Sequence, residues 1–575
     1  MLKKNVEVDL KEKTILTRRQ EKPRITGRIL LAAIPAVLAV VLFLYVDQTL
    51  IVLAAVSAPL FIFYPILEKI IKRSRVASRI KSDFPTFLLY ISALSTSLAS
   101  RKNFFKLVAS KEEYRDAAKA FKRLSVLSEQ WRYGNAKASK IVAQETPEPS
   151  FKEFLMRLSQ AISIGQPLDS FFKAEYETFL LSFSSKYERV METLKLFNDA
   201  YSSLITSIAF VSVTMLLSSM LYGLTAPEIT LSITAMLTCS ATLSMVLLFY
   251  FVTPSQPLVH IMEHRPKKLA FFQRIFKPLL IVTVSLVIVS VTYRLLEGIQ
   301  GNCTFSAEFW NVFFPVPLSF ILSGSVMFFA GFSGKKYLKK VRALEDQYPA
   351  FIRSLGASIA TVGALSAKAV ENILTNDYGK LTSYIRRLHK RLNLRMNPKI
   401  CWKLFEAETG SESIRRYTEI FTDVISVGGD PEEVSLFVSK TCIQFGILKK
   451  RRKQLTDSLR GLLIPLHIVL IAILAMGQSL ATLLSEFLSK IQSFIGLWNI
   501  IPLPLLDIFS FLILLVMSIG NALILHLLDG EANFNLLYYL GVFFLITGLV
   551  YFFVYWGCSA FMGTFAGFGS NVTVF

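Results

Sequence analysis

Three short patterns in the chain have residue types that could carry chemistry, and the most specific of them is a zinc-peptidase-like spacing. His260, Glu263 and His264 form the pattern H-x-x-E-H, which on a helix would place two imidazoles one turn apart beside a carboxylate. The pattern lies in a short basic connection, 253–277, between two apolar runs, and a proline stands on either side of it. A helix between two prolines leaves little room for a site, and no third ligand stands out. We therefore expect a coincidental match and no bound metal.

The second pattern is a glycine–lysine pair at the end of an apolar run. Gly334 and Lys335 occur in Gly331-Phe332-Ser333-Gly334-Lys335-Lys336. A phosphate-binding P-loop needs another glycine five residues before Gly334 and a serine or threonine after Lys335. Both are missing, so the sequence predicts no nucleotide site, no cofactor and no enzyme activity of its own.

The third pattern is basic, and it occurs twice in the second half of the chain. A run of five cations lies about ten residues before an apolar stretch, and a second group has helical spacing; they are Lys449, Lys450, Arg451, Arg452 and Lys453, and Arg386, Arg387, Lys390 and Arg391. Such residues can anchor a membrane protein and attract anionic headgroups, or form a solvated helix face. They can also steer an acidic protein face into register. Nucleic-acid binding is not expected, because no DNA- or RNA-binding signature is present.

The elements that must carry these residues are membrane helices. Of the 575 residues, 53% are hydrophobic and 47 are phenylalanine, and the mean hydropathy is +0.49. Because about 20 apolar residues span a bilayer as a helix, nine stretches qualify. They are 29–46, 49–67, 203–225, 229–252, 278–296, 309–332, 462–484, 505–528 and 536–556. We predict an all-α, polytopic membrane protein.

Lysine and arginine are distributed unevenly between the apolar runs, and this predicts the orientation. The net charge of +22 comes from segments that lie inside if the N-terminus is cytoplasmic. We expect a multi-pass protein of the cytoplasmic membrane with its C-terminus outside. Cys303, Cys558 and the glycosylation sequons at Asn302 and Asn571 would then be extracytoplasmic, and whether the cysteines pair stays open. The expected segments are a basic N-terminus 1–28, a membrane hairpin 29–67, a cytosolic block 68–202, four spans within 203–332, a second cytosolic block 333–461, three spans within 462–556 and a tail 557–575.

The two blocks repeat each other. Pro349 follows Pro85 by 264 residues, and Pro431 follows Pro167 by the same 264. After Pro85 and Pro349, which we expect in first helical turns, apolar residues recur as on one helix face. These residues are Phe87, Ile91, Leu94 and Leu98 in the first copy, and Phe351, Leu355, Ile359 and Val362 in the second. Each block is predicted to be a small helical bundle, with glycine-led turns before Pro167 and Pro431.

Polar residues inside the apolar runs are few. His467 and Asp507 lie near the ends of predicted spans, where we expect their side chains to reach the membrane surface. Asn521 is expected to hold helices together by hydrogen bonds. No chain of buried acids suggests an ion path, and this argues against the alternative function, a two-repeat transporter.

The repeated landmarks resemble the type II secretion system F-domain family, and within it the archaeal archaellum and pilus assembly platform proteins. The resemblance covers about 68–484 and is weaker in the first copy. It is carried by 83–88 and 347–352, which open the two domains, and by 377–382, 410–416 and 427–430.

The resemblance implies a membrane platform on which a cytosolic hexameric secretion-type ATPase acts while pilin-like or archaellin-like subunits enter a filament. The ATPase would meet the basic residues named above, with the run 449–453 as the strongest candidate. Whether the filament is an archaellum or an adhesive pilus stays open, as does the oligomeric state, for which a homodimer is one option.

Overall fold

The computed structural model describes residues 84–97, 101–146, 148–221, 227–254, 257–260, 266–300, 316–491, 503–530 and 532–569. The predicted N-terminal segment 1–28 and membrane hairpin 29–67 lie outside the described residues. So do Cys303, Asn302 and Asn571.

The regular structure of the described residues is helical, with one isolated β-bridge between Val259 and Ser411. The first bundle opens with the helix Phe84–Leu94. It continues with α4 (Arg101–Ala109), η1 (Glu112–Tyr114), α5 (Arg115–Glu129), α6 (Asn135–Glu145), α7 (Pro149–Ser163) and the start of α8 (Leu168–Leu221).

The second bundle follows the same order. It contains the end of α12 (Val316–Val362), α13 (Ala367–Ile373), η2 (Gly379–Leu381), α14 (Thr382–Asn393), α15 (Pro398–Thr409), α16 (Glu412–Ser426) and the start of α17 (Pro431–Ile491). The predicted glycine-led turns are confirmed, because Gly165 and Gly428 follow α7 and α16 with φ of 77° and 89°. Glycine adopts this left-handed conformation without the clash that a Cβ would cause.

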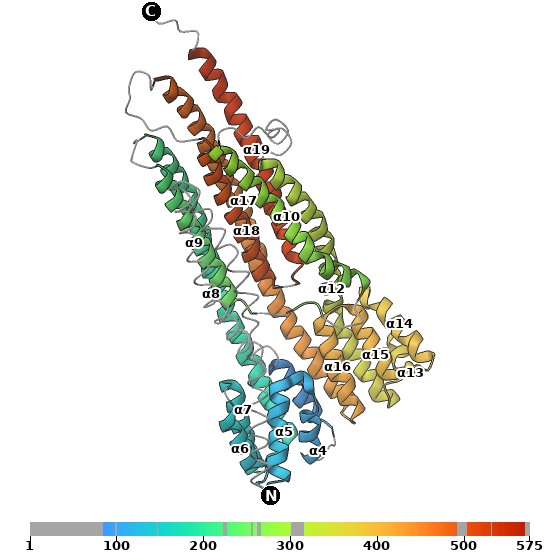
Figure 1. Ribbon diagram of the computed structural model, residues 1–575. Coiled ribbons are helices and arrows are strands. Elements are labelled where there is room, and N and C mark those ends of the chain that lie inside the picture. Colours follow the sequence, from blue (N-terminus) through green and yellow to red (C-terminus); the bar gives the residue numbers. More distant parts are fainter. Residues whose placement is uncertain are drawn as a thin grey trace, which may run out of the picture.

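The predicted apolar stripes form the core, and this core is shared between the bundles. Phe87 and Ile91 of the first bundle and Phe351 and Leu355 of the second are buried in one continuous apolar cluster. The bundles therefore pack against each other as one body below the long helices (Figure 1).

Three helices pass without interruption from the bundles into the apolar part of the molecule. They are α8 with 54 residues, α12 with 47 and α17 with 61. At the predicted boundaries after residues 202, 332 and 461 the chain stays helical. Each of these three helices therefore belongs both to a bundle and to the apolar part of the molecule.

One local prediction is wrong. Pro349 was expected in the first turn of a helix, but it lies inside α12. Proline removes one hydrogen bond from a helix interior. The burial of Tyr348 and Phe351 on either side of Pro349, and a hydrogen bond of 3.1 Å from Ser439 Oγ to its carbonyl oxygen, hold the helix through this point.

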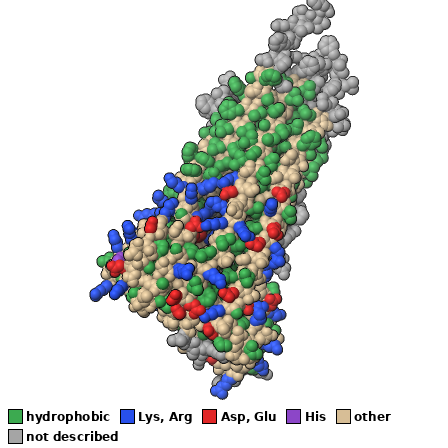
Figure 2. Space-filling model, turned by 180° about the vertical axis from the view of Figure 1, so that it is seen from behind, with side chains coloured by type: hydrophobic (Ala, Val, Ile, Leu, Met, Phe, Trp, Pro, Cys, Tyr) green, Lys and Arg blue, Asp and Glu red, His purple; other side chains and the backbone are tan. Residues whose placement is uncertain are grey.

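The apolar part of the molecule contains α9 (Pro227–Val252), α10 (Lys267–Gln300), α18 (Leu503–Asp529) and α19 (Asn535–Gly569), together with the far halves of α8, α12 and α17. Among the described residues, six helices are long and apolar enough to cross a membrane. Figure 2 shows their apolar side chains covering one end of the molecule, whereas charged side chains gather over the bundles and at the border between the two parts. The predicted all-α membrane fold is confirmed. The helix α19 continues into the predicted tail, as far as Gly569.

A buried polar cluster joins the membrane helices. Tyr201 of α8 donates a hydrogen bond of 2.6 Å to Asn521 of α18, whose amide lies 3.2 Å from Nδ1 of His467 on α17. Nε2 of His467 lies 2.9 Å from Oγ1 of Thr547 on α19. The prediction for Asn521 is confirmed. The prediction that His467 reaches the membrane surface is wrong, because its side chain is fully buried.

Candidate functional site

The contact between α8 and α17 relates the two copies. Lys440 Nζ lies 2.8 Å from Glu177 Oε1, and Arg451 forms an ion pair with Glu188. In each pair the two residues are 263 positions apart, and both helices advance by 11 residues from one pair to the next. Gly165 and Gly428, at the turns before these helices, are also 263 positions apart, so the offset of the repeat is 264 in the first helix of each bundle and 263 here. The helices therefore run parallel and in register. A residue that meets its own counterpart marks a two-fold relation, here a pseudo-two-fold along the helix axes.

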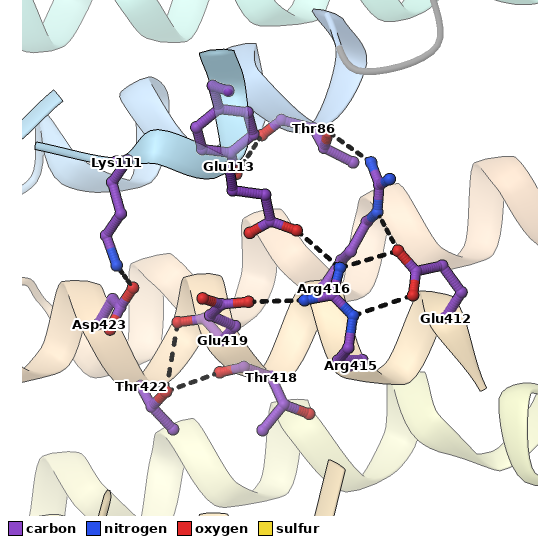
Figure 3. Close-up of polar contacts among 11 residues, drawn as sticks. Thr86, Lys111, Glu113, Glu412, Arg415, Arg416, Thr418, Glu419, Thr422 and Asp423 are labelled. Carbon is purple, nitrogen blue, oxygen red and sulfur yellow. Dashed lines mark hydrogen bonds and ion pairs between the residues drawn. The ribbon is translucent and has the colours of Figure 1, made fainter. Parts of the chain in front are cut away.

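Arg415 of α16 is the centre of the polar contact between the bundles (Figure 3). Its guanidinium donates a hydrogen bond of 2.6 Å to Glu113 of the first bundle. It also donates bonds of 2.8 to 2.9 Å to Glu412 and Glu419 on its own helix. Only 15% of the Arg415 side chain is exposed, so these charge-assisted bonds are sheltered from water.

Further contacts between the bundles surround Arg415 in Figure 3. Arg416 donates to Thr86 of the first bundle at 3.5 Å, and Lys111 pairs with Asp423 of α16. Lys173 of α8 also pairs with Glu433 of α17 at 2.5 Å. The bundles thus meet through a shared apolar core with ion pairs around it.

A buried carboxyl lies behind this cluster. Burial, and after it the charge of Glu419, raise the pKa of Glu406 to about 8. Burial, and after it the charge of Glu113, raise the pKa of Glu419 as well. Burial alone would also raise the pKa of Glu412, but hydrogen bonds from Arg415 and Arg416 hold it below its usual value. Of this group, Glu406 is therefore largely protonated at neutral pH.

The first basic group of the sequence analysis, the run 449–453, is largely engaged inside the chain. Lys449 Nζ lies 2.8 Å from both Glu345 Oε2 and Ser413 Oγ. Lys450 lies 3.3 Å from Asp346, and Arg451 forms the pair with Glu188 already described. Lys453 is exposed.

Arg452 is buried. Its guanidinium donates hydrogen bonds to the carbonyl oxygens of Leu528 and Leu527 at 2.5 and 2.9 Å, and to that of Pro254 at 2.7 Å. These carbonyls lie at the end of α18 and just after α9, where helices leave acceptors without partners. A cation there also complements the helix dipole.

The second basic group, on α14, is more accessible. Arg387 and Arg391 both pair with Glu408 of α15, and Arg387 also lies over the ring of Tyr384 at 4.5 Å. Arg386 and Lys390 are exposed, and neither forms an ion pair with another described residue.

The H-x-x-E-H pattern and the glycine–lysine pair lie in segments that pack against other parts of the chain. Nε2 of His260 lies 2.9 Å from the carbonyl oxygen of Ala407, and its backbone N–H donates to Gly410. Glu263 and His264 lie outside the described residues. Gly331 lies inside α12, where a Cβ would overlap the backbone of Tyr538 on α19, and Lys335 stands 3.7 Å above the Tyr538 ring. Both segments therefore make packing contacts.

Sequence reasoning missed the contact centred on Arg415. A local signal existed, because Glu412, Arg415, Arg416 and Glu419 have the spacing of ion pairs along a helix. That spacing could not reveal Glu113, which comes from the other copy.

Apolar helices that continue into two packed, duplicated bundles define a polytopic helical membrane protein with an internal repeat. The chain is similar to flagella accessory protein J of Methanocaldococcus jannaschii, with 27% identity over 521 residues that cover 89% of each chain. It is also similar to flagella accessory protein J of Methanococcus voltae, with 26% identity over 447 residues, 75% of this chain and 76% of that one. No protein-family profile and no solved structure matches the chain. These two likenesses, both to proteins named flagella accessory protein J, support the resemblance to archaellum and pilus assembly proteins that the sequence indicated.

Proposed function

We propose that this chain is the membrane platform of an archaellum assembly machine, and that it couples a cytosolic hexameric secretion-type ATPase to the entry of archaellin-like subunits. The likeness to two archaellal accessory proteins over most of the chain supports the platform. It gives no support to the transporter alternative. The ATPase and the filament subunits are proposed as partners on the resemblance described above.

The single observation that carries the coupling is the continuity of α8, α12 and α17. A continuous helix resists bending far more than a loop does, so movement of a bundle also moves the attached spans. Because the bundles share one core, a force on either would reach all three helices.

We place the bundles on the cytoplasmic side, with the N-terminus inside and the C-terminus outside. Lysines and arginines at the border between apolar and charged surfaces support this orientation (Figure 2). Labelling of intact cells with an impermeant thiol reagent tests this orientation. Cys558 should react, whereas a cysteine engineered at exposed Lys152 should not.

Among the predicted contact residues, we propose that Lys449, Lys450, Arg451 and Arg452 stabilise the chain itself. Their ion pairs and carbonyl contacts support this role. A contact with the ATPase then falls to exposed Lys453 and to the accessible cations of α14, of which Arg386 and Lys390 are in the predicted set.

Deletion of the gene tests the platform, and electron microscopy should show cells without archaella. A flexible insertion tests the coupling: five glycine and serine residues after Asp199 in α8 should leave the protein in the membrane but remove the filaments. The same insertion in the exposed loop after Gly363 is the control and should keep them. Normal filament numbers in the deletion strain would contradict the platform, and normal numbers with the α8 insertion would contradict the coupling alone.

A further inference from the structure

Two loops at corresponding places in the bundles are built alike. The first tip, Trp131, Arg132 and Tyr133, follows α5 and stands directly before Gly134, the N-cap of α6. The second tip, Leu394, Arg395 and Met396, follows α14 and stands directly before Asn397, the N-cap of α15. Each tip is an arginine between two apolar residues.

Both arginines have a left-handed backbone. The φ of Arg132 is 52° and that of Arg395 is 54°, and every other described residue with positive φ is a glycine. A side chain in this conformation costs about 1–2 kcal/mol. At other helix ends the chain uses glycine, as at Gly165 and Gly428. Arginine at both tips therefore opposes folding slightly, and such strain is found at functional sites.

The apolar neighbours of the arginines are exposed. Trp131 is 58% exposed and Tyr133 40%, and in the second tip Leu394 is 76% exposed and Met396 40%. The rings of Trp131 and Tyr133 stack at 6.2 Å. Tryptophan, tyrosine and arginine are the residues that contribute most often to protein–protein binding energy.

The surroundings of the tips are positively charged. Residues 130–144 contain three cations and no acid, and residues 382–405 contain seven cations, of which Arg387 and Arg391 are paired with Glu408. The exposed lysines Lys140 and Lys399 lie in these segments. This charge calls for an acidic ligand.

The tips lie far from the apolar part of the molecule, which disfavours lipid as that ligand. Ser159 Oγ donates to the carbonyl oxygen of Ala136, at the start of α6. Arg157 pairs with Glu175, so Ser159 lies near residue 173 of α8, about 45 Å of helix rise before the predicted span at 203. In the second bundle, Ala407 near the end of α15 meets His260 of the connection after α9, and the start of α15 lies about 14 Å of helix rise from that contact.

We propose that the two tips together dock a cytosolic protein whose surface carries acidic residues beside apolar pockets. The pseudo-two-fold of α8 and α17 presents the tips as a related pair, so the partner that fits is an oligomer with a two-fold axis in its symmetry. A six-fold ring contains such an axis. The inference rests on the proposed function in taking the hexameric ATPase as the partner, and two linked contacts give avidity that neither has alone.

Replacing the two arginines with glycine tests binding without lowering the stability of the fold. Arg132→Gly and Arg395→Gly remove the charge but suit the left-handed backbone, so the thermal midpoint should stay the same or rise. We expect each single variant to weaken binding of the purified archaellum ATPase about tenfold and the double variant about a hundredfold or more. Binding is measured by biolayer interferometry on the full chain in nanodiscs.

The control is Lys186→Ala with Lys195→Ala, which removes two exposed cations of α8 away from the tips and should change binding less than twofold. ATPase binding by the double glycine variant equal to that of the control would overturn the inference and leave the platform standing. No ATPase binding by the unmodified chain would also overturn it, while filament loss on deletion would still support the platform. Arginine-dependent binding of anionic lipid vesicles would replace it with a membrane contact.

Discussion

The two bundles have the same order of helices but place corresponding residues in different surroundings. Arg189 of α8 is exposed, whereas Arg452, its counterpart 263 residues later on α17, is buried against the ends of two membrane helices. Ala143 of α6 is an ordinary core residue, but its counterpart on α15 is the buried Glu406. Both copies continue into membrane helices, but the second has an additional buried contact with them through Arg452 and carries the titrating group. Corresponding residues of the two copies therefore contribute differently to the stability of the protein.

The largest difference between the copies should appear at the paired arginines. Arg452→Ala leaves three buried carbonyls without their donor, so we expect a loss of about 3–5 kcal/mol. Arg189→Ala should cost less than about 0.5 kcal/mol. The thermal midpoints of the purified variants in detergent measure both. Equal midpoints would show that the helix-end contacts of Arg452 do not stabilise the protein.

A smaller difference in stability is expected where the first helix of each bundle packs against the last helix of the same bundle. A Cβ at Gly356 of α12 would overlap the side chain of Ser435 and lie 2.6 Å from the carbonyl oxygen of Pro431. Gly356→Ala should therefore destabilise the second bundle by about 1–3 kcal/mol.

The counterpart of Gly356, 264 residues earlier, is Ser92, which donates a hydrogen bond of 2.9 Å to the carbonyl oxygen of Phe172. Ser92→Ala should cost about 1 kcal/mol, because it removes only this hydrogen bond. Limited proteolysis at rising temperature compares the two variants. A Ser92 variant cleaved earlier than the Gly356 variant would reverse the comparison.

A further difference between the copies concerns pH. The pKa of Glu406 is about 8 in the fold and 4.5 ordinarily, so folding takes up a proton between these values. Stability should therefore fall as pH rises from 4.5 to above 8. Glu406→Gln removes this titration and should therefore stabilise the protein more at pH 8.5 than at pH 5.

Thermal midpoints across this pH range test the titration, with Glu192→Gln as a control at an exposed carboxylate. A pH profile unchanged by Glu406→Gln would assign the titration to another group.

Much of this architecture was predictable because its signals are local. The apolar runs, the stripes of Phe87 and Phe351 and the glycines before Pro167 and Pro431 follow from helical periodicity and backbone freedom. The interior position of Pro349 was not predictable, because packing on both sides outweighs the local cost of proline.

The candidate site was less predictable than the fold. A run of five cations gives no sign that Arg452 alone is buried, since the carbonyls that it meets come from α9 and α18. The left-handed arginines were equally hidden, because their residue type argues against the conformation that they adopt.

The charges between α8 and α17 have a consequence for specificity. On a true two-fold axis, as in a dimer of identical halves, a residue meets itself. A glutamate at the position of Glu177 or Glu188 would then face another glutamate and repel it. In the fused chain these acids face Lys440 and Arg451, so the two halves attract each other but not themselves. Because the halves are joined in one polypeptide, acidic residues of one half can pair with basic residues of the other. A homodimer of single-copy halves could not have these pairs.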